Sequence, residues 1–190
     1  MSRMKNSTRA LEQNLRNLLG PIRLKWQLIF LSSTLAYAAS AYHALRVRPE
    51  ILWPPSLLHN LDTVSLVIVV FLALLIFHIK RRYFSTLFIR HQAAELLASR
   101  SAAQETELLR QVFTVLQAQL LRVWILAALI IAVGIVFYWA THWSRNLHIY
   151  FAVGGLSLLL NYPQKSLFAD LPWLIKQEWQ DAQQNEQDTD

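Results

Sequence analysis

The stretch Leu121–Ala140, LRVWILAALIIAVGIVFYWA, decides the fold class of this chain. Apart from Arg122 it carries no charged residue, and it matches the roughly 20 apolar residues that a helix needs to cross a bilayer core. Two other stretches have the same character, Trp26–Leu45 and Leu61–Ile79, and a shorter fourth runs over Leu147–Tyr162. We therefore predict an all-α, polytopic integral membrane protein with four transmembrane helices in two hairpins.

The composition supports the membrane class. Hydrophobic residues make up 54% of the chain and charged residues only 16%. Cysteine is absent, which excludes disulfides, thiolate metal sites and a cysteine nucleophile. The first 25 residues are polar and basic, without an apolar core that ends in a cleavage site, so we expect no cleavable signal peptide.

Basic residues are distributed unevenly between the two sides. All but three of the 18 Lys and Arg residues lie before the first apolar stretch, between the second stretch and the first turn of the third, which contains Arg122, or after the fourth. The exceptions are Arg46, Arg48 and Arg145. The positive-inside rule therefore predicts that both termini and the central segment are cytoplasmic. A bacterial inner membrane and the endoplasmic reticulum or nuclear envelope fit this pattern equally well.

The segments outside the membrane also have helical patterns. Residues 1–25 form an amphipathic lead that we expect to end at Gly20-Pro21, a strong stop signal. Residues 81–120 continue spans two and three as a predicted cytoplasmic helical hairpin, which is weakest at Ser99–Ser101, where Ser101 and Gln104 fit a capping box. The apolar face of its second arm contains Leu109, Phe113 and Leu116, which either close on the first arm or dock a partner helix. The transmembrane hairpins themselves comprise residues 26–80 and 121–162.

Residues 163–190 are predicted to form an amphipathic helix followed by an acidic polar tail. Asp170 and Pro172 fit an N-cap and a first helical turn. The tail from Gln180 onwards is expected to be disordered. Tryptophan favours the membrane interface because it combines an apolar body with a polar tip. The tryptophans expected there are Trp26, Trp124, Trp173 and Trp179.

Small residues predict where helices pack closely within the membrane. They recur every fourth residue in the first span and cluster in the third and fourth. The predicted packing positions are Ser32, Ala36, Ser40, Ala44, Ala128, Ala132, Gly134, Gly154 and Gly155. The second span is rich in large apolar residues, so we expect it to form a wall that faces lipid or a partner.

Histidine supplies the only concentration of possible chemistry. His43, His59, His142 and His148 all lie near the predicted outer face. Imidazole can bind a metal or haem iron, or respond to pH. The four histidines lack tight ligand spacing, and histidine is also comfortable at a membrane interface, so plain interfacial packing is the alternative.

No sequence motif indicates catalysis, and we expect neither enzymatic activity nor a cofactor. A nucleic-acid partner is not expected either, because the basic residues do not form a face interleaved with aromatics. The pattern favours a non-enzymatic accessory, scaffold or regulatory subunit that contacts the lipid bilayer and a protein partner or another copy of itself. The alternative is a small oligomeric transporter or channel, and a metal- or haem-binding protein is the third hypothesis.

Two resemblances in layout point the same way. Residues 11–97 resemble the regulatory subunits of nuclear-envelope lipin phosphatases in the amphipathic lead, Trp26, Arg48-Pro49-Glu50 and the basic flank His78–Arg82. The whole layout is similar to reticulon-like membrane-shaping proteins, with two hairpins and a terminal amphipathic helix. Both resemblances imply a helper or shaping role without catalysis.

Overall fold

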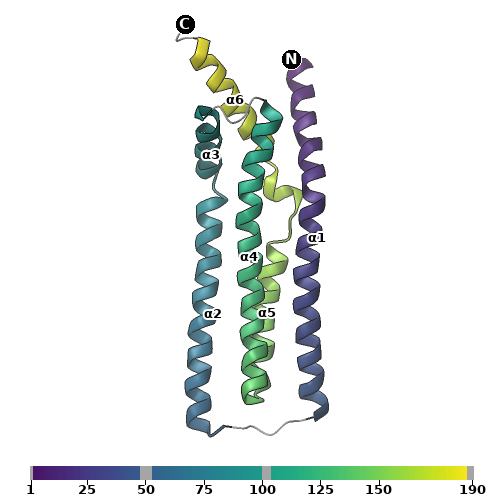
Figure 1. Cartoon of the computed structure of the whole chain (residues 1–190), viewed down its shortest axis with the longest axis vertical. Helices are drawn as coiled ribbons and strands as arrows, with labels where there is room; N and C mark the ends of the chain where they lie inside the picture. Colours follow the sequence, from purple (N-terminus) through teal and green to yellow (C-terminus); the bar gives the residue numbers. More distant parts are fainter. Residues whose placement is uncertain (1, 48–52, 100–103, 188–190) are drawn as a thin grey trace. The chain divides into compact units, whose positions relative to one another are not determined.

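A computed structural model describes residues 2–47, 53–99 and 104–187, and most of these residues are helical, with no strand among them (Figure 1). The all-α prediction is therefore confirmed. The helices are α1 (Ser2–Val47), α2 (Pro55–Tyr83), α3 (Thr86–Ala98), α4 (Glu105–Thr141), α5 (Ser144–Leu160), the 3₁₀ turn η1 (Lys165–Phe168) and α6 (Leu171–Gln187).

Three of these helices are long and apolar enough to cross a membrane. They are α1 from Gln13 onwards, α2 and α4, which contain the first three predicted spans. The fourth predicted span coincides with α5, which has 17 residues and a length of about 25 Å at about 1.5 Å per residue. The length and composition of the helices thus identify three candidate spans and leave the fourth as a prediction.

The chain divides into two compact units, each with its own packing. The first, here called the flanking unit, comprises Met1–Leu24, Ile79–Leu120 and Pro163–Asp190. The second, here called the membrane unit, comprises Lys25–His78 and Leu121–Tyr162 and contains the four predicted spans apart from Ile79.

Within the membrane unit, α4 and α5 approach each other closely. A Cβ atom placed on Gly154 of α5 would lie 2.6 Å from the carbonyl oxygen of Ala127 in α4, so only glycine fits there. The α1 helix contacts both α4 and α5 through side-chain hydrogen bonds. Only Leu58, Ser65, Val69 and Ile76 of α2 are buried, and most of its large apolar side chains are exposed, as expected for the wall of the unit.

The core of the flanking unit combines residues from segments far apart in the sequence. The apolar face of α4 packs with the chain that leads into α6, where the rings of Phe113 and Phe168 meet edge to face at 5.3 Å. The α3 helix packs against α6. Other buried members of this core are Leu15, Leu19, Ile22, Ala93, Leu171, Leu174 and Ile175.

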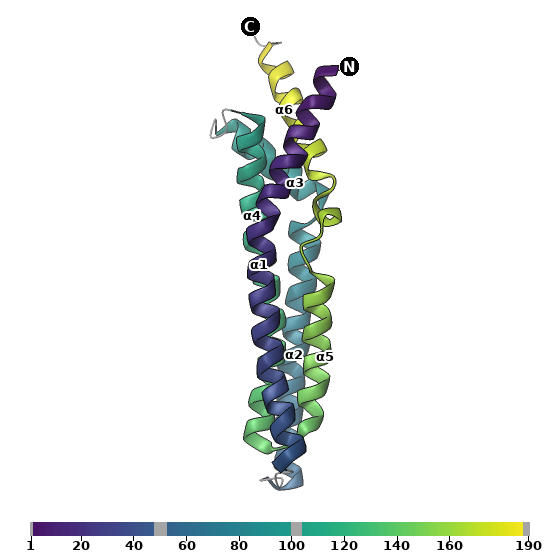
Figure 2. The same cartoon turned by 90° about the vertical axis from the view of Figure 1, so that its right-hand side faces the viewer.

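The predicted stop at Gly20-Pro21 is wrong, because α1 continues through both residues (Figure 2). Proline removes the backbone donor that would bond to the carbonyl of Asn17. Asn17, Gly20 and Pro21 all lie on the exposed side of the helix, so water can satisfy that carbonyl. The buried residues Leu19 and Ile22 keep the helical spacing on either side of the stop signal.

The first arm of the predicted cytoplasmic hairpin is also interrupted. Its helix ends at Tyr83 and restarts at Thr86, instead of continuing from span two (Figure 1). Ser85 is the cause, because it has an extended backbone and its hydroxyl accepts a hydrogen bond from the N–H of Phe88 at 3.2 Å, as an N-cap does. The second arm is continuous with span three in α4.

The start of the C-terminal helix was predicted correctly, but its end was not. The α6 helix begins directly after Asp170, with Pro172 in its first turn, as predicted. It then continues to Gln187 instead of becoming disordered after Gln180. The capping box proposed for Ser101 falls outside the described residues.

Candidate functional site

Two of the four predicted histidines lie close together in an aromatic cluster at one end of the membrane unit. His43 of α1 shares a hydrogen bond with the buried hydroxyl of Tyr138 in α4, at 2.7 Å. Its ring lies 4.6 Å from the ring of Trp139 and 6.4 Å from that of His142. His142 follows the last turn of α4 with a backbone φ of 60°, an uncommon conformation for a residue with a side chain.

The other two histidines lie elsewhere. His148 of α5 shares a 2.9 Å hydrogen bond with the hydroxyl of Tyr37, whose ring stacks on Phe151. His59 is exposed on α2. Among the described residues, no group of three or more histidines and carboxylates could hold a metal ion. The predicted set is therefore divided: His43 and His148 each bond to a tyrosine hydroxyl, and His142 packs near the rings of His43 and Tyr138.

A polar network joins α2 to α5 within the membrane unit. Asn146 donates to a carboxylate oxygen of Asp62 at 2.5 Å and lies 3.4 Å from the hydroxyl of Ser65. The Ser65 hydroxyl also bonds to the Tyr150 hydroxyl at 2.9 Å. Ser65, Asn146 and Tyr150 are buried, and Asp62 is partly exposed. The network therefore links a carboxylate, which is costly to bury in apolar surroundings, to three buried neutral groups.

None of these four residues was among the site residues predicted from the sequence. The spacing of these residues could have indicated the network: Asp62 and Ser65 are three residues apart, and Asn146 and Tyr150 are four apart. Such pairs lie on one face of a helix. Two short polar faces within apolar helices predict that those helices meet there.

The predicted small-residue contacts are unequal in the structure. Gly134 and Gly154 lie at tight contacts between α4 and α5, where added Cβ atoms would come within 3.0 and 2.6 Å of neighbouring atoms. At Gly155 the nearest atom would be 4.0 Å away, so this position is not tight. Ser40 is buried and accepts a 3.0 Å hydrogen bond from the indole of Trp139.

The rest of the small-residue stripe on α1 is not closely covered. Ser32 and Ala36 are exposed and Ala44 is partly exposed. Ser32 and Ala36 line an open groove that also contains Ala128 and Ala132 of α4. Small residues therefore allow α1 and α4 to approach, but in this part of the unit they leave space between the helices.

Two of the predicted interfacial tryptophans are core residues. Trp26 and Trp124 are buried, and their indole N–H groups donate at 2.9 Å to the carbonyls of Leu158 and Asn161. These carbonyls belong to the last turn of α5 and its C-cap, where no further helical turn can supply donors. The tryptophans therefore complete the end of a short helix. Trp173 is exposed and Trp179 is partly exposed, so these two of the four predicted residues lie at the surface.

The predicted partner contacts are internal. Leu109, Phe113 and Leu116 are each at most 1% exposed within the flanking unit. Of the two possibilities left open by the sequence, the structure therefore has a closed apolar face, although Phe113 meets Phe168 instead of a residue of α3. A partner cannot dock on these side chains without opening the unit.

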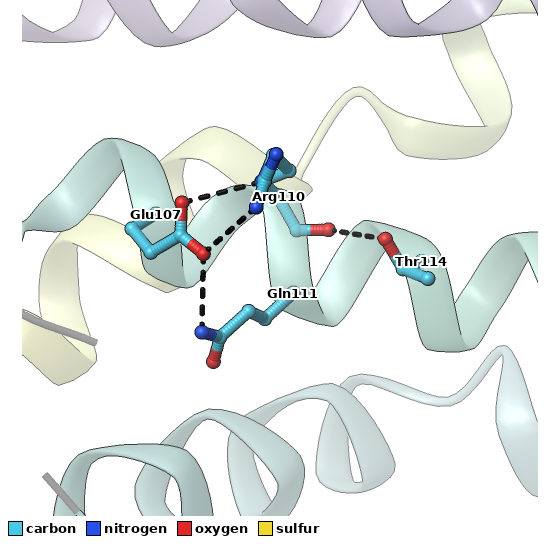
Figure 3. A network of polar contacts seen from close by, with 4 residues as sticks. All are labelled: Glu107, Arg110, Gln111 and Thr114. Carbon is cyan, nitrogen blue, oxygen red and sulfur yellow. Dashed lines mark hydrogen bonds and ion pairs between the residues drawn. The ribbon is translucent and has the colours of Figure 1, made fainter. Parts of the chain in front are cut away.

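The start of α4 carries a polar network on its outer face (Figure 3). Glu107 forms an ion pair with Arg110 at 3.2 Å and accepts a hydrogen bond from Gln111 at 3.2 Å. Thr114 donates to the backbone carbonyl of Arg110 at 2.8 Å. Arg110, Gln111 and Thr114 also line a groove of about 470 Å³ with Leu18 and Leu96. These bonds connect residues one turn apart and stabilise the first turns of the helix.

Comparison of the chain with protein-family models, with curated proteins and with solved structures gave no match. Neither resemblance in layout gains support from these comparisons.

Proposed function

We propose that this protein is a non-enzymatic accessory or scaffold subunit of a membrane complex, which contacts its partner through the flanking unit. The positive-inside rule assigns that unit to the cytoplasm, together with both termini. The buried face of α4 is not part of the proposed contact. The contact surface is instead the outer side of α3, η1 and α6.

The observation that carries this proposal is the exposure of large apolar residues on those elements. Leu87 of α3 is 79% exposed, Trp173 of α6 is 58% exposed, and Leu167 of η1 is also exposed. The α3 and α6 helices pack against each other. Apolar side chains on adjacent elements outside the apolar spans have no lipid core to enter, so a protein partner is the natural cover for them.

The α3–α6 pair also has a fixed geometry. Arg90 donates to the side-chain oxygen of Gln177 at 2.8 Å and forms an ion pair with Glu178 at 3.7 Å. Leu87 lies one turn before Arg90, and Trp173 lies one turn before Gln177. These polar contacts therefore hold the backbone next to both exposed residues, which lowers the entropic cost of binding a partner.

A double variant tests the proposal. Leu87→Ser with Trp173→Ser removes the exposed apolar groups, and Ala94→Ser, at another exposed position of α3, is the matched control. We expect a partner that co-purifies with the wild type in mild detergent to be lost from the double variant and kept by the control. Circular dichroism should be the same for all three proteins. A partner that stays bound to the double variant would refute this contact surface.

The Asp62 network supports a second candidate function, a small oligomeric transporter or channel. An ionisable residue within an apolar segment is a candidate for an ion or substrate pathway. Asp62→Asn keeps the shape of the side chain and removes its charge, and Asn60→Ala is an exposed control on the same helix. If the protein forms a pathway, flux into liposomes should fall in the Asp62 variant and not in the control. An absence of flux in the wild type would remove this candidate.

A further inference from the structure

An open apolar groove lies between α1 and α4 within the membrane unit. Its volume is about 410 Å³, and nearly all of its lining is carbon. Two lining residues of α4, Ile125 and Leu129, are close to half exposed, so the groove is open along its side. The narrow walls come from Ser32, Ser33 and Ala36 on α1 and from Ala128 and Ala132 on α4.

The groove arises from the way in which these two helices meet. Beyond it, Ser40 contacts Trp139 and His43 contacts Tyr138, so large aromatic side chains of α4 fill the space at that end. In the groove itself both helices present small side chains. The Ser32 hydroxyl donates to the carbonyl of Ile29 in its own helix at 3.0 Å, so it does not need water in the groove.

Residue numbers rise in the same direction along both helices at this contact. The groove is lined by residues 29–36 of α1 and residues 125–135 of α4. Further along both helices, Ser40 contacts Trp139 and His43 contacts Tyr138. Lys25 and Arg122 therefore lie at about the same level, just beyond the end of the groove that is opposite the aromatic cluster.

Both basic residues also lie on the face of their helix that carries the groove. Lys25 precedes Ser32 by seven residues, and Arg122 precedes Leu129 by seven. Seven residues are close to two helical turns, so each pair shares a face. Lys25 and Arg122 are both exposed. An apolar groove thus ends at two cations, one on each wall.

We propose that this groove binds one acyl chain of an anionic phospholipid, whose phosphate lies between Lys25 and Arg122. The aliphatic walls match the chain, and the two cations match the headgroup. Basic pockets between transmembrane helices are a known kind of site for anionic lipid headgroups. The inference is independent of the proposed protein partner, because it uses only residues of the membrane unit.

The size of the groove favours a lipid over a second protein helix. A helix with its side chains is about 10–12 Å wide, so a volume of this size holds only about one helical turn. A single acyl chain is narrow and can lie along the groove over its full length. The open side would admit it laterally from the bilayer.

Native mass spectrometry of the full-length protein tests the proposal. The protein in mild detergent is mixed with phosphatidylglycerol or with phosphatidylcholine that has the same acyl chains. We expect phosphatidylglycerol to bind at least tenfold more tightly. In the double variant Lys25→Gln with Arg122→Gln, its affinity should fall to that of phosphatidylcholine. Arg145→Gln, an exposed arginine at the start of α5, is the control and should keep the preference.

A second variant tests the groove itself. Ala36→Leu with Ala132→Leu fills the space between the helices, and both lipids should then bind at least tenfold more weakly, with an unchanged thermal transition. Should the double charge variant fail to fold, Lys25→Gln alone is expected to give an intermediate preference. Equal binding of the two lipids by the wild type, or an unchanged preference in the charge variants, would overturn the proposal. So would unchanged lipid binding by the variant with the filled groove.

Discussion

At the scale of single residues, the tryptophans show what the sequence could and could not reveal. Trp26 and Trp124 each lie within two residues of a basic residue near the predicted start of a span, which is the usual pattern of interfacial anchors. Their indole groups instead bond to the end of α5, more than 30 residues away in the sequence. The type and position of a residue predict its depth in the membrane, but not which distant carbonyl it satisfies.

The first prediction concerns this contact. Trp124→Phe keeps an aromatic ring but leaves the carbonyl of Asn161 without its indole donor. Loss of a buried hydrogen bond of this kind should destabilise the protein by about 1–3 kcal/mol. Trp173→Phe changes an exposed residue and should shift stability by less than about 0.5 kcal/mol. Reversible unfolding in detergent measures both values, and similar values for the two variants would contradict the capping role.

A second prediction compares two adjacent glycines. Gly154→Ala would place a methyl group 2.6 Å from both a backbone oxygen and the Ile131 side chain, and such overpacking costs about 1–3 kcal/mol. Gly155→Ala meets only an ordinary contact at 4.0 Å and should be tolerated. Melting temperatures in the same detergent distinguish the two. The sequence predicted a tight position at both glycines, because spacing alone does not say which one faces α4.

At the scale of elements, long apolar patterns were predicted well and local breaks were not. The α4 helix follows from an uninterrupted run of helix-forming and apolar residues. Pro21 does not end the helix, because the carbonyl that loses its backbone donor lies on the exposed side of α1. The buried residues around Pro21 keep their helical spacing. The helix is interrupted at Ser85 although no Gly or Pro is present there. The Ser85 hydroxyl accepts the hydrogen bond of the Phe88 N–H in place of a backbone carbonyl. Both outcomes depend on burial and local bonding, which the order of residues does not specify.

The third prediction concerns the core of the flanking unit. Phe113→Ser with Leu116→Ser removes two buried apolar side chains, of which the Phe113 change alone should cost about 3–5 kcal/mol. We expect hydrogen exchange to rise in residues 105–120 and 171–179, while residues 121–141 remain protected. Thr114→Ser keeps the hydroxyl that bonds to Arg110 and is the control. A stable double variant would mean that the apolar face of α4 is not the core of this unit.

At the scale of the whole molecule, the contact between α3 and α6 bears on the number of spans. The α3 helix follows the second predicted span and α6 follows α5, and the two helices pack in the same unit. If α4 crosses the membrane, the chain must return to the side of α3 before α6 begins. Only α5 is available for this crossing. At about 25 Å it is shorter than a bilayer core of about 30 Å, but a modest local thinning of the bilayer accommodates such a mismatch.

The fourth prediction concerns topology. The chain has no cysteine, so single cysteines introduced at exposed positions report sidedness directly. With four spans, Ser56→Cys and Arg145→Cys should react with an impermeant thiol reagent in intact cells. Ser99→Cys and Gln183→Cys should react only after permeabilisation. An even number of crossings separates each position from the N-terminus, which is predicted to be cytoplasmic, so both positions return to that side. If α5 did not cross, position 183 would react like position 145. That result would be incompatible with the packing of α6 on α3 in a chain whose other three long helices span the membrane.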